Sequence, residues 1–157
     1  MSCRRELLHV VTVLAVVAAV ACGGDDDSVP TGPSPSIAVF EGAWSGTITS
    51  SAAGQGTLRV ALATASTAAL QGEWQASFAG ASNAQSGTAS ATLSDGGRFL
   101  LLSLARSPAP APCAKPGQVD TGVVNLFATY QDEHLTATYS TLTCDGTVDG
   151  RIDLVKE

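Results

Sequence analysis

The sequence predicts an all-β protein: a single antiparallel up-and-down β-barrel of about eight strands, which follows an export signal and a disordered tether. Beyond the N-terminal apolar run, the chain shows no helical periodicity. Apolar and polar residues instead alternate in short segments, and Gly and Asp mark turns between the segments. The richness in Ser, Thr, Ala and Gly is typical of strands and turns.

The N-terminal residues have the pattern of an export signal. Arg4 and Arg5 precede an apolar run that starts at Leu7 and is too short for a comfortable membrane span, and small residues stand before Cys22. This order resembles the signal of bacterial lipoproteins, although Ala19 stands where that class usually has Leu. The resemblance implies that residues 1–21 are removed and that Cys22 carries the lipid.

A lipidated Cys22 implies attachment to the cell envelope. Several buried acyl chains, at ~0.8 kcal/mol per methylene, would hold the protein firmly on a membrane. In enterobacterial lipoproteins, an Asp directly after the lipidated cysteine resembles a signal for retention in the inner membrane. Here Gly23 stands at that position. We therefore expect the outer membrane, on its periplasmic face or at the cell surface. The alternatives are a cleaved secretory signal and an uncleaved anchor.

Residues 22–36 are expected to form a flexible tether. They are mostly Gly, Asp, Ser and Pro, and Pro30, Pro33 and Pro35 break any regular structure. Residues 37–157 then form one domain by length.

The expected strands follow one another along residues 37–157. The pattern is clearest from Leu70 to Phe78, where every second residue is apolar or glycine. The other expected strands are Trp44 to Ile48, Leu58 to Leu62, Ala89 to Leu93, Phe99 to Leu104, Val124 to Tyr130, Leu135 to Leu142 and Val148 to Leu154. A barrel and a sandwich can both bury such strands, and the short loops favour the barrel, which has no open edge.

The segment Phe40 to Trp44 resembles the Gly-x-Trp start of the first strand in lipocalins, and a similar start occurs in avidins. In lipocalins this Trp plugs the barrel base against an Arg of the last strand, which makes Arg151 the matching residue, although its parity points outward. The segment Thr129 to Asp132 weakly resembles the second sequence motif of the lipocalins. Biotin binding is not expected, because no Trp lies in the late strands.

Cys113 and Cys144 are expected to form a disulfide. Cys3 leaves with the signal and Cys22 takes the lipid, so two cysteines remain in an exported chain. In an eight-strand meander the two lie at the same end of the barrel. The bond would stabilise the fold by roughly 3 to 4 kcal/mol. A free redox pair is the alternative, but the chain has no Cys-x-x-Cys.

Alternation also predicts which residues face the barrel interior. Small inward residues such as Gly46, Gly72 and Ala89 would leave a lumen that an apolar ligand fills. The candidate lumen residues are Trp44, Leu58, Val60, Trp74, Ala76, Phe78, Ala91, Leu126, Tyr130 and Tyr139. A packed barrel without a cavity is the alternative. No charged residue is expected to face inward, so a charged ligand group would stay at the rim near Lys115, Asp120 or Asp145.

The sequence predicts neither an enzyme nor a cofactor. His134 lies beside a turn among acidic neighbours, which is typical of a solvated residue. Asp120 to Phe127 resembles the Asp-Thr-Gly segment of aspartic proteases, but no second copy follows, so we expect a turn there. No cluster has metal-ligand spacing. The formal net charge of −6 disfavours nucleic acid as a partner.

Two functions remain. The first is a membrane-anchored carrier whose lipocalin-like barrel binds a small apolar ligand, or the same barrel as a scaffold. The second is a protein-binding or protease-inhibitor-like lipoprotein. It would act through the disulfide end, which points away from the membrane because the tether enters at the other end. This second function loosely resembles that of bacterial metalloprotease inhibitors with a lipocalin-like barrel. The cysteines of those inhibitors lie in the early strands of the barrel, whereas Cys113 and Cys144 lie in the later part of this chain.

Overall fold

The computed structural model describes residues 36–80, 84–94, 97 and 99–157. The predicted signal, the tether up to residue 35 and the lipidation site at Cys22 lie outside these residues. Within them, no helix is long and apolar enough to cross a membrane.

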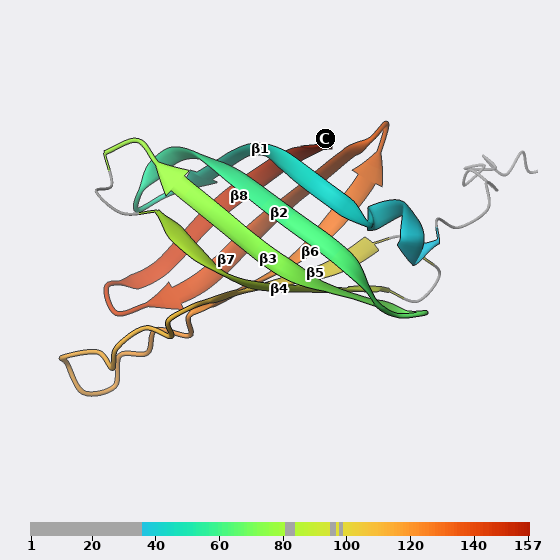
Figure 1. Ribbon diagram of the computed structural model, residues 1–157. Helices are drawn as coiled ribbons and strands as arrows, with labels where there is room; N and C mark the ends of the chain where they lie inside the picture. The colour runs from blue at the N-terminus through green and yellow to red at the C-terminus, as the bar shows by residue number, and fades with distance from the viewer. Residues whose placement is uncertain (1–35, 81–83, 95–96, 98) are drawn as a thin grey trace, which may run out of the picture. The chain divides into compact units, whose positions relative to one another are not determined.

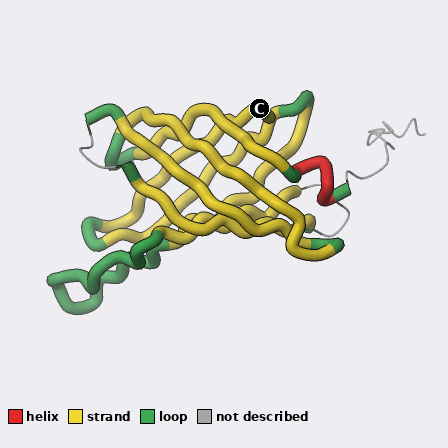
Figure 2. The backbone as a smooth tube through the Cα atoms, viewed as in Figure 1, coloured by secondary structure: helices red, strands yellow, loops and turns green. Residues whose placement is uncertain are grey.

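Eight antiparallel strands close into an up-and-down barrel, which confirms the predicted fold (Figure 1). Each strand pairs with the next along the chain, and the last strand pairs with the first. The strands are β1 (Gly42–Ser50), β2 (Gly54–Ser66), β3 (Ala69–Phe78), β4 (Gln85–Leu93), β5 (Phe99–Arg106), β6 (Val123–Gln131), β7 (His134–Thr143) and β8 (Gly146–Lys156). Figure 2 shows that the strands run obliquely around the barrel.

The predicted alternation places one face of every strand in the interior. Buried residues recur at every second position of β2, β3 and β5, and the described residues include no buried polar or charged side chain. Glycines allow the wall to bend inward. A Cβ on Gly72 would collide with the carbonyl oxygen of Ala61, and one on Gly46 with that of Asp153, so only glycine fits at these close approaches.

One end of the barrel, called the base, is closed by the short 3-10 helix η1 (Ile37–Phe40). The Trp44 indole N–H donates to the Phe40 carbonyl oxygen at 2.9 Å. The Tyr130 ring packs edge-on against the rings of Phe40 and Trp44, with centroid distances of 5.2 Å and 6.1 Å, respectively. Lys156 lies 5.7 Å from the Trp44 ring centroid and donates to the carbonyl oxygen of Val39 at 2.8 Å. Helix η1, three aromatic rings and the Lys156 side chain therefore fill the base.

The cation at the base corrects one expectation. Trp44 does plug the base, but its partner from the last strand is Lys156 and not Arg151, which is exposed on the outer face. The reason is register. Trp44 stands opposite Lys156, whereas Arg151 stands opposite Thr49, five residues further along β1.

Several element boundaries also differ from expectation. β5 continues past Leu104 to Arg106. β1 and β2 leave only residues 51–53 as their loop. The turn after Gln131 holds two residues, Asp132 and Glu133, both with positive φ as a tight hairpin turn requires.

The other end, called the mouth, carries a long projection, residues 107–122, that we call the arm (Figures 1 and 2). Cys113 in the arm is bonded to Cys144 in the β7–β8 turn, with 5.3 Å between the Cα atoms, so the predicted disulfide is confirmed. Four prolines stiffen the arm, and the N–H of Gln118 donates to the carbonyl oxygen of Lys115 across a turn beyond the disulfide.

Candidate ligand-binding site at the mouth of the barrel

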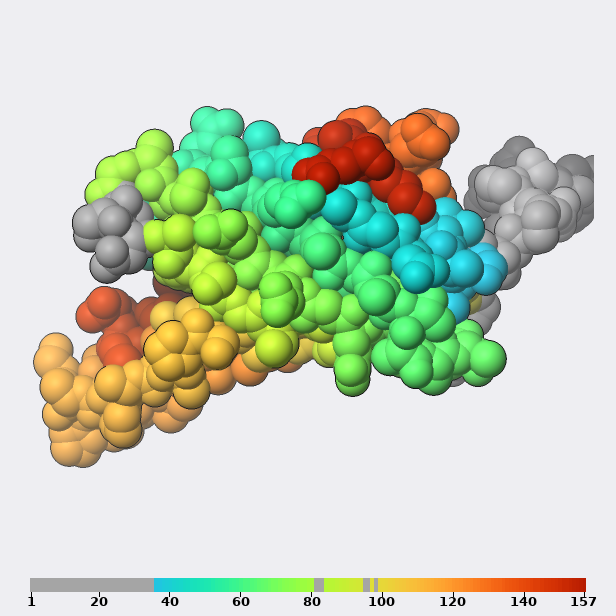
Figure 3. Space-filling model, viewed as in Figure 1, coloured from blue at the N-terminus to red at the C-terminus, as the bar shows by residue number. Residues whose placement is uncertain are grey.

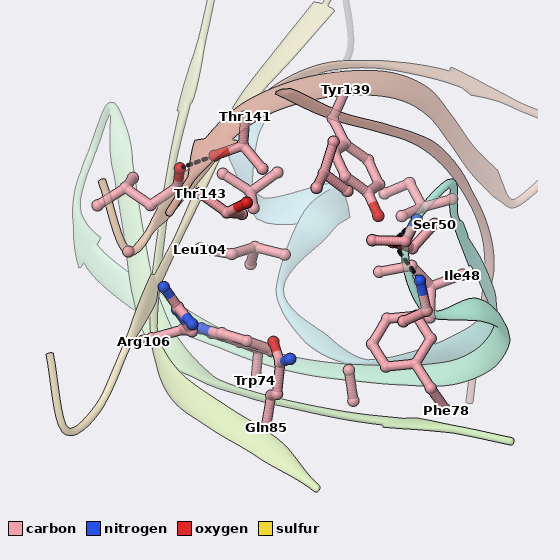
Figure 4. A pocket seen from close by; sticks show the side chains of 18 of the residues that line it. Ile48, Ser50, Trp74, Phe78, Gln85, Leu104, Arg106, Tyr139, Thr141 and Thr143 are labelled. Carbon is pink, nitrogen blue, oxygen red and sulfur yellow. Dashed lines mark hydrogen bonds between the residues drawn. The ribbon is translucent and has the colours of Figure 1, made fainter. Parts of the chain in front are cut away.

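A cavity of about 160 Å³ opens at the mouth, and we call it the cup. Figure 4 looks into it. Its apolar lining comes from Ile48, Trp74, Ala76, Phe78, Leu104, Val124, Leu126, Tyr139, Val148 and Ile152. The sequence left two alternatives open, a packed barrel and a barrel with a lumen. Side chains pack against one another at the base, whereas a cavity lies at the mouth, so each alternative describes one end of the barrel.

Three aromatic rings at the cup lie across from glycines of the neighbouring strand. Directly opposite in register are Trp74 and Gly87, Phe78 and Gly56, and Tyr139 and Gly150. In each pair, a Cβ added to the glycine would run into the aromatic side chain. The rings therefore occupy the space that a side chain on the next strand would fill. This cross-strand packing keeps them against the wall and leaves the centre of the mouth open.

Hydrogen bonds fix two of these rings. The Trp74 indole N–H donates to the carbonyl oxygen of Ala105 at 3.0 Å, and the Tyr139 hydroxyl donates to that of Thr49 at 2.9 Å. Burial raises the pKa of Tyr139, so this hydroxyl keeps its proton at neutral pH. Both residues thus present apolar ring faces to the cup.

An ion pair stands at the lip of the cup. Arg106 occupies the last inward position of β5, and its Nη2 donates to Oδ1 of Asp120 at the end of the arm. The same oxygen accepts from the N–H of Gly122 at 3.0 Å. The carbonyl oxygen of Gly122 in turn accepts from the backbone N–H of Arg106 at 2.8 Å. The pair therefore joins the arm to the wall.

The Asp120 carboxylate is ionised at neutral pH. Burial opposes its ionisation, but the hydrogen bonds from Arg106 and Gly122 and the charge of Arg106 outweigh burial, so the pKa of Asp120 lies below its usual value. The Asp-Thr-Gly segment joins the arm to β6. The turn expected there is not found: the segment is irregular, with the Asp120 carboxylate accepting from the Gly122 N–H and a positive φ at Gly122. Its Thr121 hydroxyl lies 3.2 Å from that of Thr141.

The inward position of Arg106 contradicts the expectation that no charged residue faces the interior. Leu100, Leu102 and Leu104 are buried on the inner face of β5, and two more residues of strand bring Arg106 to the same face. Of the three rim residues expected near a charged group, Asp120 lines the cup, whereas Lys115 and Asp145 are exposed and do not.

The structure divides the candidate lumen residues into three groups. Trp74, Ala76, Phe78, Leu126 and Tyr139 line the cup. Leu58, Val60 and Ala91 are buried in the core but do not line it, and Trp44 and Tyr130 pack at the base. Four further lining residues were not predicted from the sequence: Ile48, Leu104, Gln85 and Arg106. The same alternation, followed to the mouth end of each strand, would have found them.

The remaining polar candidates lie elsewhere. The Nδ1 atom of His134 lies 3.0 Å from Oδ1 of Asp153 on the outer surface, where both side chains are about half exposed. Within the described residues, no group of three or more His, Cys, Asp or Glu side chains could hold a metal ion.

A scan against models of known protein families and a search of curated proteins both gave no match. Among solved structures, the chain is similar to one described as "Structure of a redesigned beta barrel, b11L5F_LGL". The TM-score is 0.52 at 15% sequence identity, and the match covers 76% of this chain and 93% of the other. At this identity the likeness concerns the fold alone: a small, closed, eight-stranded antiparallel barrel.

Proposed function

We propose that the protein is a lipid-anchored envelope protein whose cup binds a small, mainly apolar ligand. The observation that carries the proposal is the cavity of about 160 Å³ behind an open mouth. A cavity of roughly 150 Å³ lined by apolar side chains is large enough for benzene. Pockets for drug-sized ligands measure roughly 300 to 1,000 Å³. The cup therefore suits a single ring or a short chain.

The anchor rests on the sequence. Arg4 and Arg5, the apolar run and Cys22 follow the order of a lipoprotein signal, and the polar residues up to Ser36 leave a tether before the barrel. In the barrel, η1 enters at the base, and the cup opens at the opposite end. A tethered barrel of this kind would keep its mouth accessible.

A pair of alanine substitutions tests the cup. Ala76 lines it, whereas Ala63 on β2 is exposed on the outer face. We expect the full-length protein in lipid nanodiscs to bind toluene in ligand-observed NMR, with empty nanodiscs as the reference. Ala76→Trp should abolish this binding and Ala63→Trp should preserve it. Equal binding by the two variants would exclude the cup as the site.

The arm supports a second candidate function, protein binding at the mouth. It projects from the body of the molecule (Figure 3) and is held by the disulfide and by the Arg106–Asp120 pair. Val119 on the arm is 57% exposed, so its apolar side chain is accessible to a partner. A photo-crosslinker at Val119, expressed in the native host, should capture a defined protein, whereas the same group at Thr88 on the outer wall should not. Identical products from both positions would rule out docking through the arm.

A further inference from the structure

Most polar groups around the cup are already engaged within the barrel wall. The Trp74 N–H and the Tyr139 hydroxyl donate to backbone carbonyls. Thr141 and Thr143 donate to the carbonyl oxygens of Val123 and Gly146, at 2.9 Å and 3.0 Å. None of these four groups has a hydrogen left to donate to a ligand.

Three side chains at the cup retain donors. One is Ser50, whose hydroxyl oxygen accepts from the N–H groups of Ala52 and Ala53 but donates to no described residue. The other two, Arg106 and Gln85, lie together. Arg106 carries five N–H groups and gives one, on Nη2, to Asp120. Gln85 is the first residue of β4, and among the described residues its amide has no hydrogen-bond partner. Arg106 stands opposite Gly87, two residues from Gln85 on the same face of β4. Figure 4 shows both on the lower wall of the cup, across from Tyr139.

The charge at the lip is balanced. Asp120 already neutralises Arg106, and no other cation lines the described part of the cup. A ligand carboxylate at Arg106 would therefore lie near the ionised Asp120, and the two like charges would repel. A ligand without any acceptor has the opposite problem. It would cover the donors of Arg106 and Gln85 without pairing them, and sites with such donors discriminate against ligands of this kind.

We propose that the cup selects a neutral molecule with one apolar ring or short chain that ends in a hydrogen-bond acceptor, such as an aromatic ketone, aldehyde or lactone. The inference rests on the proposed binding function and names the ligand class of the same site. The carbonyl oxygen accepts from Arg106 and Gln85 at the lip. The ring lies below it, between Trp74, Phe78 and Tyr139.

Three single-ring probes of similar size test the ligand class: toluene, acetophenone and benzoate. Each is titrated by ligand-observed NMR against the full-length protein in nanodiscs at pH 7. We expect acetophenone to bind about tenfold more tightly than toluene, because it pairs donors that toluene leaves unpaired. We expect benzoate to bind more weakly than acetophenone. Benzoate as the tightest ligand would overturn the inference.

Variants assign the preference to the two donors. Gln85→Met keeps the length of the side chain and removes its donors, and Arg106→Lys keeps the charge beside Asp120 but removes the fork of N–H groups. Both should bring the toluene and acetophenone affinities closer together. Arg59→Met, on the outer face, is the matched control and should change neither. An unchanged ratio in both lip variants would refute the assignment.

The outcomes separate this inference from the proposed function. If toluene and acetophenone bind equally and Ala76→Trp abolishes both, the cup binds apolar molecules without selecting an acceptor, and only the inference fails. If no probe binds, or if Ala76→Trp leaves binding intact, the proposed function fails as well.

Discussion

Asp120 connects the arm to the barrel through a single carboxylate, and its folded-state pKa lies below the usual value. A carboxyl of this kind stabilises the fold when it is ionised. The contribution is complete above the pKa of the unfolded chain, near ~3.9, and is lost as the pH falls through the lower pKa of the folded state.

Replacing Asp120 by Asn should therefore destabilise the protein in a pH-dependent way. We expect a loss of about 1 to 2 kcal/mol in the free energy of unfolding at pH 7, because a partly buried charged hydrogen bond disappears. The difference from wild type should stay constant above about pH 5 and shrink below about pH 4. Urea denaturation across this range measures it. Asp149→Asn, at an exposed position, is the control, and a difference for Asp120→Asn that does not vary with pH would contradict the prediction.

Two inward alanines should respond differently to added bulk. Ala91 is 1% exposed in the packed part of the barrel, whereas Ala76 lines the cup. We expect Ala91→Trp to lower the free energy of unfolding by ~1 to 3 kcal/mol through overpacking. Ala76→Trp should cost clearly less, since the ring can enter the cavity. Chemical denaturation compares them, and equal losses would mean that the cavity cannot accept a ring.

Arg106 and Lys156 show where single-residue prediction from the sequence stops. Both lie at strand ends on the inner face, where the alternation of apolar and polar residues breaks down. A charged residue at such a position looks like the start of a loop. Only the register between strands decides whether it is still part of the wall, and register depends on contacts distant in the sequence.

Among the elements, β6 and β7 form the least regular contact in the wall. Their ladder pairs residues 129–131 with 134–136, at the base. Toward the mouth, the Thr141 hydroxyl bonds the carbonyl oxygen of Val123, and the N–H of Thr121 donates to the carbonyl oxygen of Leu142 at 3.2 Å. The disulfide fastens the arm beside this part of the wall. Side-chain hydrogen bonds and the disulfide thus support the seam between β6 and β7, where the ladder of paired backbone residues is short.

Removal of the disulfide should loosen this seam first. The bond spans 31 residues in sequence, so the Cys113→Ser/Cys144→Ser variant should lose about 3 to 4 kcal/mol and melt roughly 10 °C lower. In hydrogen exchange, Val123 and Leu142 should lose more protection than Trp44 at the base. A uniform rise in exchange would contradict a local role for the bond.

The eight elements were predictable because alternation is a local property of each strand, and every buried face needed a partner. The cup was less predictable. Its volume depends on three aromatic residues standing opposite Gly56, Gly87 and Gly150, and the sequence does not show which residues face each other across strands.

At the scale of the whole molecule, the proposed anchor would decide where the cup works. Cys22→Ser should move the protein from the membrane fraction to a soluble or unprocessed form, because it removes the thiol that we propose accepts the lipid. Cys3→Ser, within the predicted signal, is the matched control and should stay with the membrane. Metabolic labelling with palmitate together with cell fractionation measures both. Wild-type protein found entirely in the soluble fraction would refute the anchor.

The pairing of β1 with β8 makes the barrel a ring without a unique starting strand. Ser36 adjoins η1 at the base, and the N–H of Glu157 donates to Ala43 at the beginning of β1. A short linker could join these two ends, and the chain could be opened between Ala52 and Ala53 at the mouth. Such a circular permutant would keep every ladder and would have its chain ends at the mouth, so the end of the barrel at which the chain begins is a matter of chain order and not of fold.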